Sequence, residues 1–233
     1  MDPAVIEAVT EDWKTAPVSD QIRGAISLLE MQTLRAGDIT PESLAAVMDQ
    51  GLDWDAIEQV VNVGFHFNFI NRIADAFDFP PPTSSQKKKQ AKMLTFMARS
   101  AFFSKKSDPS WVVGEDGKPR PVELESARNQ IFSAAGSTEA QLRKAVESYT
   151  AMKCQGDRPD LEMELSPEQV DYLDTLSLYA YRITDDQIEQ LRGSGMSDRQ
   201  IFEITYAGAL GASMPAVESV YLLLHETSLV DPS

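Results

Sequence analysis

The amino-acid sequence predicts an all-α protein, and three observations lead to this prediction. Apolar residues recur at helical spacing over long stretches, whereas the alternation that marks strands is almost absent. Residues that favour the start or the end of a helix stand at the ends of these stretches. Finally, residues 39–77 recur in weaker form at residues 183–221, as expected for a repeated helical unit.

The first two predicted helices lie before residue 52. The first covers residues 18–38, and its apolar residues predict one core-facing side made of Ile22, Ile26, Leu29 and Leu34. The second has the sequence ITPESLAAVMDQG. Thr40 can accept hydrogen bonds from the first free amides, Pro41 suits the first helical position, and Gly51 suits the end of the helix.

A long third helix is predicted from an N-cap at Asp53 to about Phe77. The prolines at residues 80–82 end it, because proline cannot continue a helix. Apolar residues at spacings of three and four predict a continuous core-facing stripe, which consists of Val60, Val63, Phe67, Ile70, Ala74 and Phe77. The other sides of this helix become polar in its second half.

The middle of the chain, residues 80–165, contains predicted helices and one irregular stretch. Residues 85–103, SQKKKQAKMLTFMARSAFF, have helical spacing. Within the irregular stretch, the dipeptide Asp116-Gly117 predicts a tight turn in a small hairpin. Two further helices follow, the second with Ser137 as its cap, and residues from 166 onward are predicted to be helical almost to the end of the chain.

The internal repeat aligns residues 39–77 with residues 183–221 without a gap. The identical positions are a cap, a helix-ending glycine and core positions: Ile39 with Ile183, Thr40 with Thr184, Gly51 with Gly195, Ile57 with Ile201, and Gly64 with Gly208. A helix precedes each unit. We therefore predict one domain over residues 1–233, with repeats at 18–79 and 166–226 related by a pseudo-two-fold axis, and with inter-repeat helices and a loop at 80–165.

A helix, a T…L…G…D…I pattern and a long helix that ends in FNFINRIADAF together resemble the alkylhydroperoxidase D (AhpD)-like and carboxymuconolactone decarboxylase superfamily. The similarity is greatest to the two-repeat, peroxidase-related members. It rests mainly on residues 39–77 and is weaker over residues 183–221. The resemblance implies an AhpD-like all-α fold and assembly into a homo-oligomer.

The redox members of that superfamily share a Glu…Cys-x-x-Cys-x-x-x-His motif, whose two cysteines cycle between dithiol and disulfide. The residues that the resemblance places at the two cysteine positions and the histidine position here can neither form a thiolate nor relay a proton: Ala36, Ile39 and Ser43 in the first unit, and Ala180, Ile183 and Gln187 in the second. The only cysteine, Cys154, lies outside both units. The resemblance therefore implies the scaffold without its redox dithiol.

Composition narrows the range of partners. The net charge of −15 would repel phosphate backbones, so we expect no nucleic-acid partner. A single cysteine permits no internal disulfide. The N-terminus is not a signal peptide and no apolar run approaches ~20 residues, so we expect a cytoplasmic protein without a membrane segment. The two histidines stand far apart without ligand spacing, so we expect no metal and no cofactor.

The stretch FHFNFINRIADAF contains the candidate ligand-binding residues, which are His66, Asn68, Asn71 and Arg72. In a structural interpretation, His66 is a core or interface residue and Arg72 pairs with Asp75. In the alternative, the arginine and the amides line a pocket for a small organic acid. We favour the structural interpretation for His66 and expect Asn68 and Arg72 to be more exposed.

Three functions remain open, and no catalytic residue is assigned. The first is a small-molecule-binding or interaction protein that has kept the scaffold and lost the redox centre, assembled most simply as a dimer. The second is a non-redox enzyme that acts on a small organic acid through His66 and Arg72 by acid–base chemistry. The third is residual alkylhydroperoxidase-type activity through Cys154.

Overall fold

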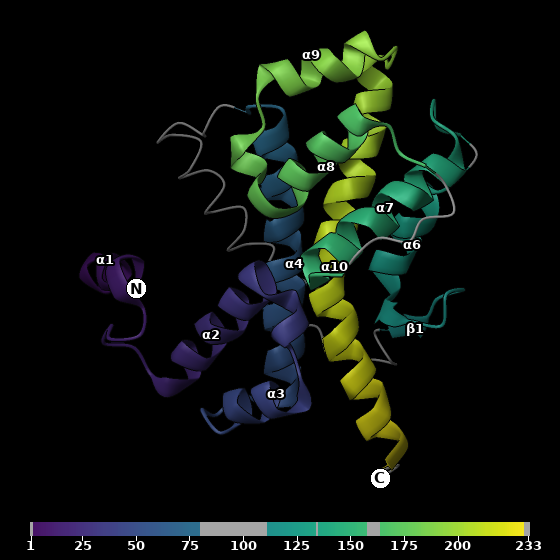
Figure 1. The fold of residues 1–233 in the computed structure, drawn as a ribbon. Helices are drawn as coiled ribbons and strands as arrows, with labels where there is room; N and C mark the ends of the chain where they lie inside the picture. Colours follow the sequence, from purple (N-terminus) through teal and green to yellow (C-terminus); the bar gives the residue numbers. More distant parts are fainter. Residues whose placement is uncertain (1, 80–110, 134, 158–163, 231–233) are drawn as a thin grey trace.

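The structure, a computed structural model, describes residues 2–79, 111–133, 135–157 and 164–230, and most of these residues are helical (Figure 1). The all-α fold class is therefore confirmed. The helix predicted at residues 85–103 lies outside the described residues. The elements are α1 (Pro3–Asp12), α2 (Asp20–Leu34), the 3-10 turn η1 (Ala36–Asp38), α3 (Pro41–Met48), α4 (Trp54–Ala76), β1 (Trp111–Val113), β2 (Pro119–Pro121), α6 (Val122–Ile131), α7 (Ala140–Gln155), α8 (Pro167–Tyr179), the 3-10 turn η2 (Ala180–Arg182), α9 (Asp185–Gly193) and α10 (Asp198–Val230).

The two long helices α4 and α10 form the centre of the fold (Figure 1). Helices α2 and α3 pack near α4, whereas α7, α8 and α9 surround the N-terminal half of α10. Two apolar clusters result. One joins α2, α3 and α4 to the C-terminal half of α10, and the other joins α7, α8 and α9 to its N-terminal half. Helix α10 thus contributes to both clusters.

The ranges predicted as repeats, residues 18–79 and 166–226, contain the same elements in the same order: a helix, a 3-10 turn, a short helix and a long helix. Thr40 and Thr184 each begin the short helix with a capping box. Gly51 and Gly195 each follow it with φ of +97°, a left-handed conformation that favours glycine. The side chain of Asp53 caps α4 by accepting a hydrogen bond from the Ala56 amide at 2.8 Å, as the sequence predicted.

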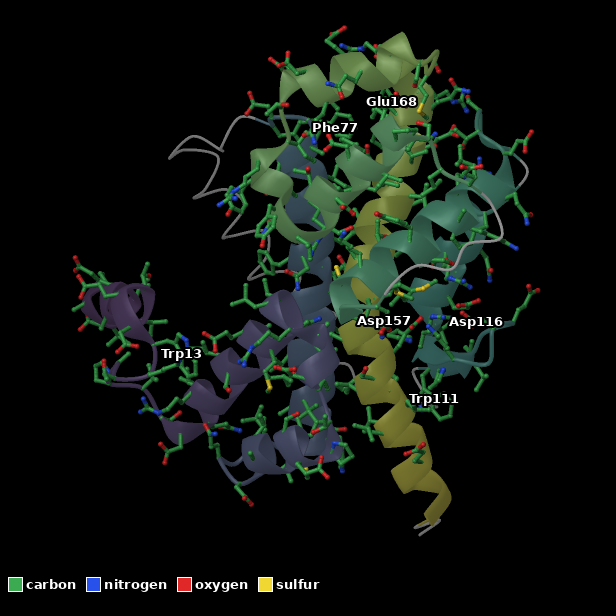
Figure 2. All side chains as sticks on the ribbon, in the orientation of Figure 1. Trp13, Phe77, Trp111, Asp116, Asp157 and Glu168 are labelled. Carbon is green, nitrogen blue, oxygen red and sulfur yellow. The ribbon has the colours of Figure 1, made fainter. Side chains whose placement is uncertain are left out.

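The predicted hairpin is present. Strands β1 and β2 pair antiparallel with Val112 opposite Arg120, and Gly117 turns the chain with φ of +78°. Figure 2 shows Trp111 and Asp116 beside the C-terminal half of α10, against which β2 packs.

The predicted core-facing stripe of α4 is wrong. Val63, Phe67 and Ile70 are exposed, by 40%, 61% and 57%. The buried side instead contains Ile57, Glu58, Val61, Gly64, Phe65, Asn68 and Ala76. The reason is the close approach of α2 at Gly64, where an added Cβ would lie 2.7 Å from Leu29 Cδ2. Only the side of α4 that carries this glycine can meet α2 at that distance.

The predicted apolar side of α2 also needs correction. Ile22 and Leu34 are exposed, by 39% and 70%. The buried residues of this helix are Gly24, Leu28, Met31 and Gln32. Gly24 lies where an added Cβ would be 2.9 Å from Leu52 Cδ1, so the glycine again marks the packed side.

Helix α10 is long and apolar enough between Asp198 and Leu224 to span a membrane, but 72% of its apolar window is buried inside the structure. Burial of this extent is typical of the core helix of a soluble protein.

Candidate functional site

The structure separates the four candidate residues of α4. His66 and Asn71 are exposed, Asn68 is buried at 9% exposure, and Arg72 is partly buried. The Nδ1 atom of His66 lies 2.7 Å from the backbone oxygen of Asn62, one turn earlier. His66 therefore does not lie in the core, and the expectation that Asn68 and Arg72 are more exposed than His66 is wrong. The alternative role of His66 as an interface residue stays a prediction. Residues 66 and 68 point to different sides of the helix, and α4 buries the side of Asn68.

Arg72 connects α4 to α8. Its Nη1 donates a hydrogen bond to the backbone oxygen of Asn68 at 3.0 Å, and its Nη2 donates to the backbone oxygen of Ser177 at 3.1 Å. Its Nε is buried and has no hydrogen-bond partner in the part of the chain that the structure describes. The predicted pair with Asp75 is not formed as an ion pair, although the Asp75 charge favours the cationic form.

Arg72 is therefore a largely buried cation without a carboxylate partner among the described residues. Burial lowers the pKa of its guanidinium, because a charged group loses hydration there, while Cys154 and Asp75 act in the opposite direction. Both hydrogen bonds of Arg72 are to neutral backbone carbonyls. In a chain with net charge −15, a buried arginine without an acidic partner is an unusual arrangement.

Cys154 lies beside Arg72, although the sequence placed it outside both units. Its Sγ donates a hydrogen bond to the backbone oxygen of Ser177 at 3.5 Å, so the thiol and the guanidinium contact the same carbonyl. Burial raises the pKa of the Cys154 thiol, and the nearby Arg72 charge offsets this only in part. The thiol is therefore protonated at neutral pH and a poor nucleophile.

These two side chains line a cavity of about 210 Å³, here named the Arg72 pocket. It lies where the end of α2, the turn η1 and helices α4, α7, α8 and α10 meet. Ala36, which the resemblance places at a cysteine position, also lines it. Leu34 and Tyr179 line it as well, and both side chains are largely exposed, by 70% and 48%. The pocket is thus connected to solvent.

Arg72 and Cys154 were both identified from the sequence, but no sequence pattern indicated that they lie next to each other. His66 is not a lining residue of the Arg72 pocket. Within the described ranges, no group of three or more histidine, cysteine, aspartate or glutamate side chains could hold a metal ion. The pocket instead combines one cation, one neutral thiol, the polar residues Gln32, Thr33 and Ser177, and apolar side chains. Arg72 is the one charged residue of this lining, so the pocket complements a small anion.

Comparison of the chain with protein-family models, with curated proteins and with solved structures found no match. A functional proposal therefore depends on the residues of this chain alone.

Proposed function

We propose that this chain is a cytoplasmic protein that binds a small organic carboxylate in the Arg72 pocket, on an AhpD-like scaffold of two helical repeats. The observation that supports the proposal most directly is the guanidinium of Arg72, which is largely buried beside a cavity and has no carboxylate partner among the described residues. A bound carboxylate would supply the missing negative charge.

The chemistry of the guanidinium favours a carboxylate over a neutral ligand. Arginine offers five N–H donors in a planar fork, and the structure uses Nη1 and Nη2 for one backbone carbonyl each. The Nε donor is buried, so a ligand would bind the hydrogens of Nη1 and Nη2 that these two carbonyls leave unused. Hydrogen bonds between ionised partners are about twice as strong as neutral ones, and a carboxylate can accept two from one arginine.

The correspondence between the two aligned segments supports the scaffold part of the proposal. Their shared capping boxes and left-handed glycines lie at the aligned positions. The second segment has Ala216 where the first has Arg72, and Ala216 is buried at 1% exposure. The arginine of the pocket therefore comes from the first proposed unit and has no counterpart in the second.

Neither enzymatic alternative receives comparable support. Acid–base catalysis by His66 and Arg72 together requires both side chains at one site, and His66 does not line the Arg72 pocket. Peroxidase-type chemistry at Cys154 requires a thiolate, and burial raises the pKa of this thiol. Binding requires neither condition.

Replacing Arg72 with glutamine should weaken the binding of small aliphatic carboxylates. We expect acetate, lactate or succinate to bind the parent protein, and the best of them to lose about 10- to 100-fold in affinity to Arg72→Gln, because charge-assisted hydrogen bonds are lost. Isothermal titration calorimetry measures the change. Arg192→Gln, in an exposed arginine of α9, is the matched control and should bind as the parent does. Equal affinities of the parent and Arg72→Gln would refute the proposal.

A homodimer is the second part of the proposal, and the exposed side of α4 supports it. Between residues 59 and 71 this helix has no aspartate, glutamate, lysine or arginine, while Val63, Phe67 and Ile70 are exposed. Interface centres are depleted of charge and enriched in aromatic residues. An uncharged strip is also where two copies, each with net charge −15, can approach with least repulsion.

The assembly is tested by placing a charge in this strip. We expect the parent to have the mass of a dimer in light scattering at micromolar concentration, and Phe67→Glu to have the mass of a monomer, because two carboxylates would meet at the interface. Glu7→Gln, in the N-terminal helix, should leave the mass unchanged. A parent protein of monomeric mass would disprove the dimer.

A further inference from the structure

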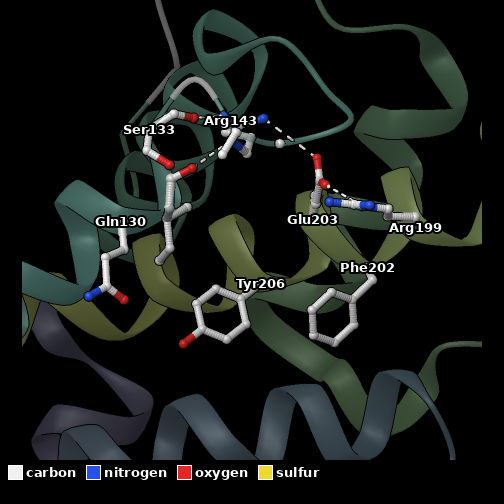
Figure 3. A pocket seen from close by; sticks show the side chains of 10 residues that line it. Gln130, Ser133, Arg143, Arg199, Phe202, Glu203 and Tyr206 are labelled. Atoms are coloured by element: carbon white, nitrogen blue, oxygen red, sulfur yellow. Dashed lines mark hydrogen bonds and ion pairs between the residues drawn. The ribbon is translucent and has the colours of Figure 1, made fainter.

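A second cavity of about 270 Å³, here named the aromatic pocket, lies between the α6–α7 corner and the N-terminal half of α10 (Figure 3). Its walls include Gln130 and Ser133 from the corner and Arg199, Phe202 and Tyr206 from α10. None of these residues lines the Arg72 pocket. The two cavities are therefore distinct.

The upper wall of the aromatic pocket is a closed hydrogen-bonded cluster around Arg143. This arginine is only 2% exposed, and it donates to the backbone oxygens of Ile131 at 2.6 Å, Ser133 at 2.6 Å and Thr138. Its Nη1 also lies 3.5 Å from Glu203 Oε2. The donors of Arg143 are thus occupied, and its role is to hold the corner in place.

Glu203 completes this wall from the side of α10. Its carboxylate accepts hydrogen bonds from the amides of Ser137 and Thr138, each at 2.7 Å. Burial opposes ionisation, but these hydrogen bonds outweigh it and hold the pKa of Glu203 at about 2. Ser137 was predicted as the cap of the following helix, but α7 begins at Ala140 and the Ser137 amide donates to Glu203 instead. The acid of this pocket is thus already engaged by the protein.

The floor consists of two aromatic rings that remain open to the cavity. Phe202 is 46% exposed, and its ring centroid lies 6.0 Å from that of Tyr206. Figure 3 shows the two rings side by side on α10, with the Tyr206 hydroxyl directed toward the side on which Gln130 lies. Phe69 and Phe77 of α4 support them from behind, with centroid distances of 4.8 Å to Tyr206 and 5.7 Å to Phe202. The floor is therefore backed by α4, and its two rings are tilted by 38° to each other.

The groups left for a ligand are mostly hydrogen-bond donors. Arg199 uses its Nε for Glu203 at 3.3 Å, and its two Nη groups have no further partner among the described residues. Gln130 and Ser133 also line this cavity and could form hydrogen bonds through an amide and a hydroxyl. Arg143 and Arg199 are positively charged and Glu203 is negatively charged, so the walls carry a net charge of about +1. An acceptor, and preferably an anion, complements these groups.

We infer that the aromatic pocket binds an aromatic carboxylate, with its ring on Phe202 and Tyr206 and its acid group toward Arg199. Aromatic rings pair favourably in offset or edge-to-face arrangements, and two rings tilted by 38° allow a ligand ring to stack on one and meet the other at an angle. The size agrees, since an engineered cavity of about 150 Å³ in another protein already admits benzene. A cavity of about 270 Å³ has room for one ring with a substituent.

The proposal is tested with three probes that separate the ring from the acid: benzoate, benzyl alcohol and cyclohexanecarboxylate. Calorimetric titration of the full chain should show the tightest binding for benzoate. Phe202→Leu should weaken benzoate by about 2- to 10-fold and spare cyclohexanecarboxylate. Arg199→Gln should weaken benzoate by about 3- to 10-fold and spare benzyl alcohol. Both side chains are exposed, so thermal unfolding should confirm that these variants fold as the parent does.

Arg72→Gln provides the control that separates this site from the Arg72 pocket. Benzoate affinity should be unchanged in this variant, whatever happens to the aliphatic acids. If Arg72→Gln removes benzoate binding while Phe202→Leu and Arg199→Gln keep it, benzoate occupies the other cavity and the inference is wrong. It is also wrong if benzoate does not bind the parent, or binds no better than cyclohexanecarboxylate.

Discussion

Replacing Gly211 with alanine should destabilise the folded chain by about 2–4 kcal/mol. Gly211 lies where α10 crosses α7, and an added Cβ would overlap the backbone oxygen of Glu147 and the Oγ1 of Thr150 and lie 2.8 Å from the backbone carbon of Glu147. A backbone cannot rotate away as a side chain can. The two helices must separate instead, which loosens the packing that α10 provides to both apolar clusters. This cost exceeds the ~1 kcal/mol by which alanine favours a helix over glycine.

Substitutions at two other glycines serve as comparisons for this prediction. Gly193→Ala should leave the free energy of unfolding nearly unchanged, because a Cβ there meets nothing within 4 Å. Gly208→Ala should be intermediate, because its Cβ would meet side-chain atoms that can move, 2.8 Å from Leu176 Cδ2 and 3.1 Å from Leu173 Cδ2. Denaturant unfolding of the three variants measures the order. Equal midpoints for Gly211→Ala and Gly193→Ala would show that α7 and α10 do not pack at this distance.

The parts of the fold that the sequence predicted correctly depend on short-range chemistry. Asp53 caps α4 by bonding an amide three residues later, and Thr40 does the same for α3. Gly51 and Gly117 adopt the left-handed conformations that end a helix or make a hairpin turn. Each of these preferences acts within four residues, so it is readable without knowledge of the tertiary structure.

The parts that the sequence could not predict depend on contacts between distant segments. The spacing of apolar residues in α4 is compatible with more than one buried side. The side that is buried is the one that packs against α2 at Gly64. Arg72 finds its acceptor on Ser177, 105 residues later, and Cys154 reaches the same carbonyl from α7. The sequence thus identified Arg72 as a candidate but not its surroundings, and it gave no reason to place Cys154 beside it.

The same limit applies to a buried charge cluster that holds the β-hairpin against α10. Arg120 of β2 is 1% exposed, and its guanidinium donates to Glu218 of α10, to Asp116 of the turn and to Glu125 of α6. Arg128 extends the cluster to Glu147 of α7 at 2.6 Å. Arg120 therefore neutralises carboxylates from three different elements, and no other described cation contacts all three.

Replacing Arg120 with methionine should destabilise the fold by about 3–5 kcal/mol at neutral pH, because three carboxylates then lose their central, buried cation. Among the described residues, only Lys118 and Arg128 remain as cations beside these carboxylates. The loss should depend on pH. Burial opposes ionisation of Asp116, but the hydrogen bonds and charge of Arg120 outweigh it and hold the pKa at about 2, below the ordinary 3.8. In the parent, this pair stabilises the fold above pH ~4 and loses its effect as the pH falls toward ~2. The difference between parent and Arg120→Met should therefore be largest near neutral pH and shrink below pH ~4, as the carboxylates of the variant become protonated.

Arg192→Met, which breaks only exposed ion pairs with Glu189 and Asp198, should change stability little at any pH. Unfolding in urea from pH 3 to 8 tests both expectations, and a deficit in Arg120→Met that stays constant over this range would show that the charge of these carboxylates is not its cause.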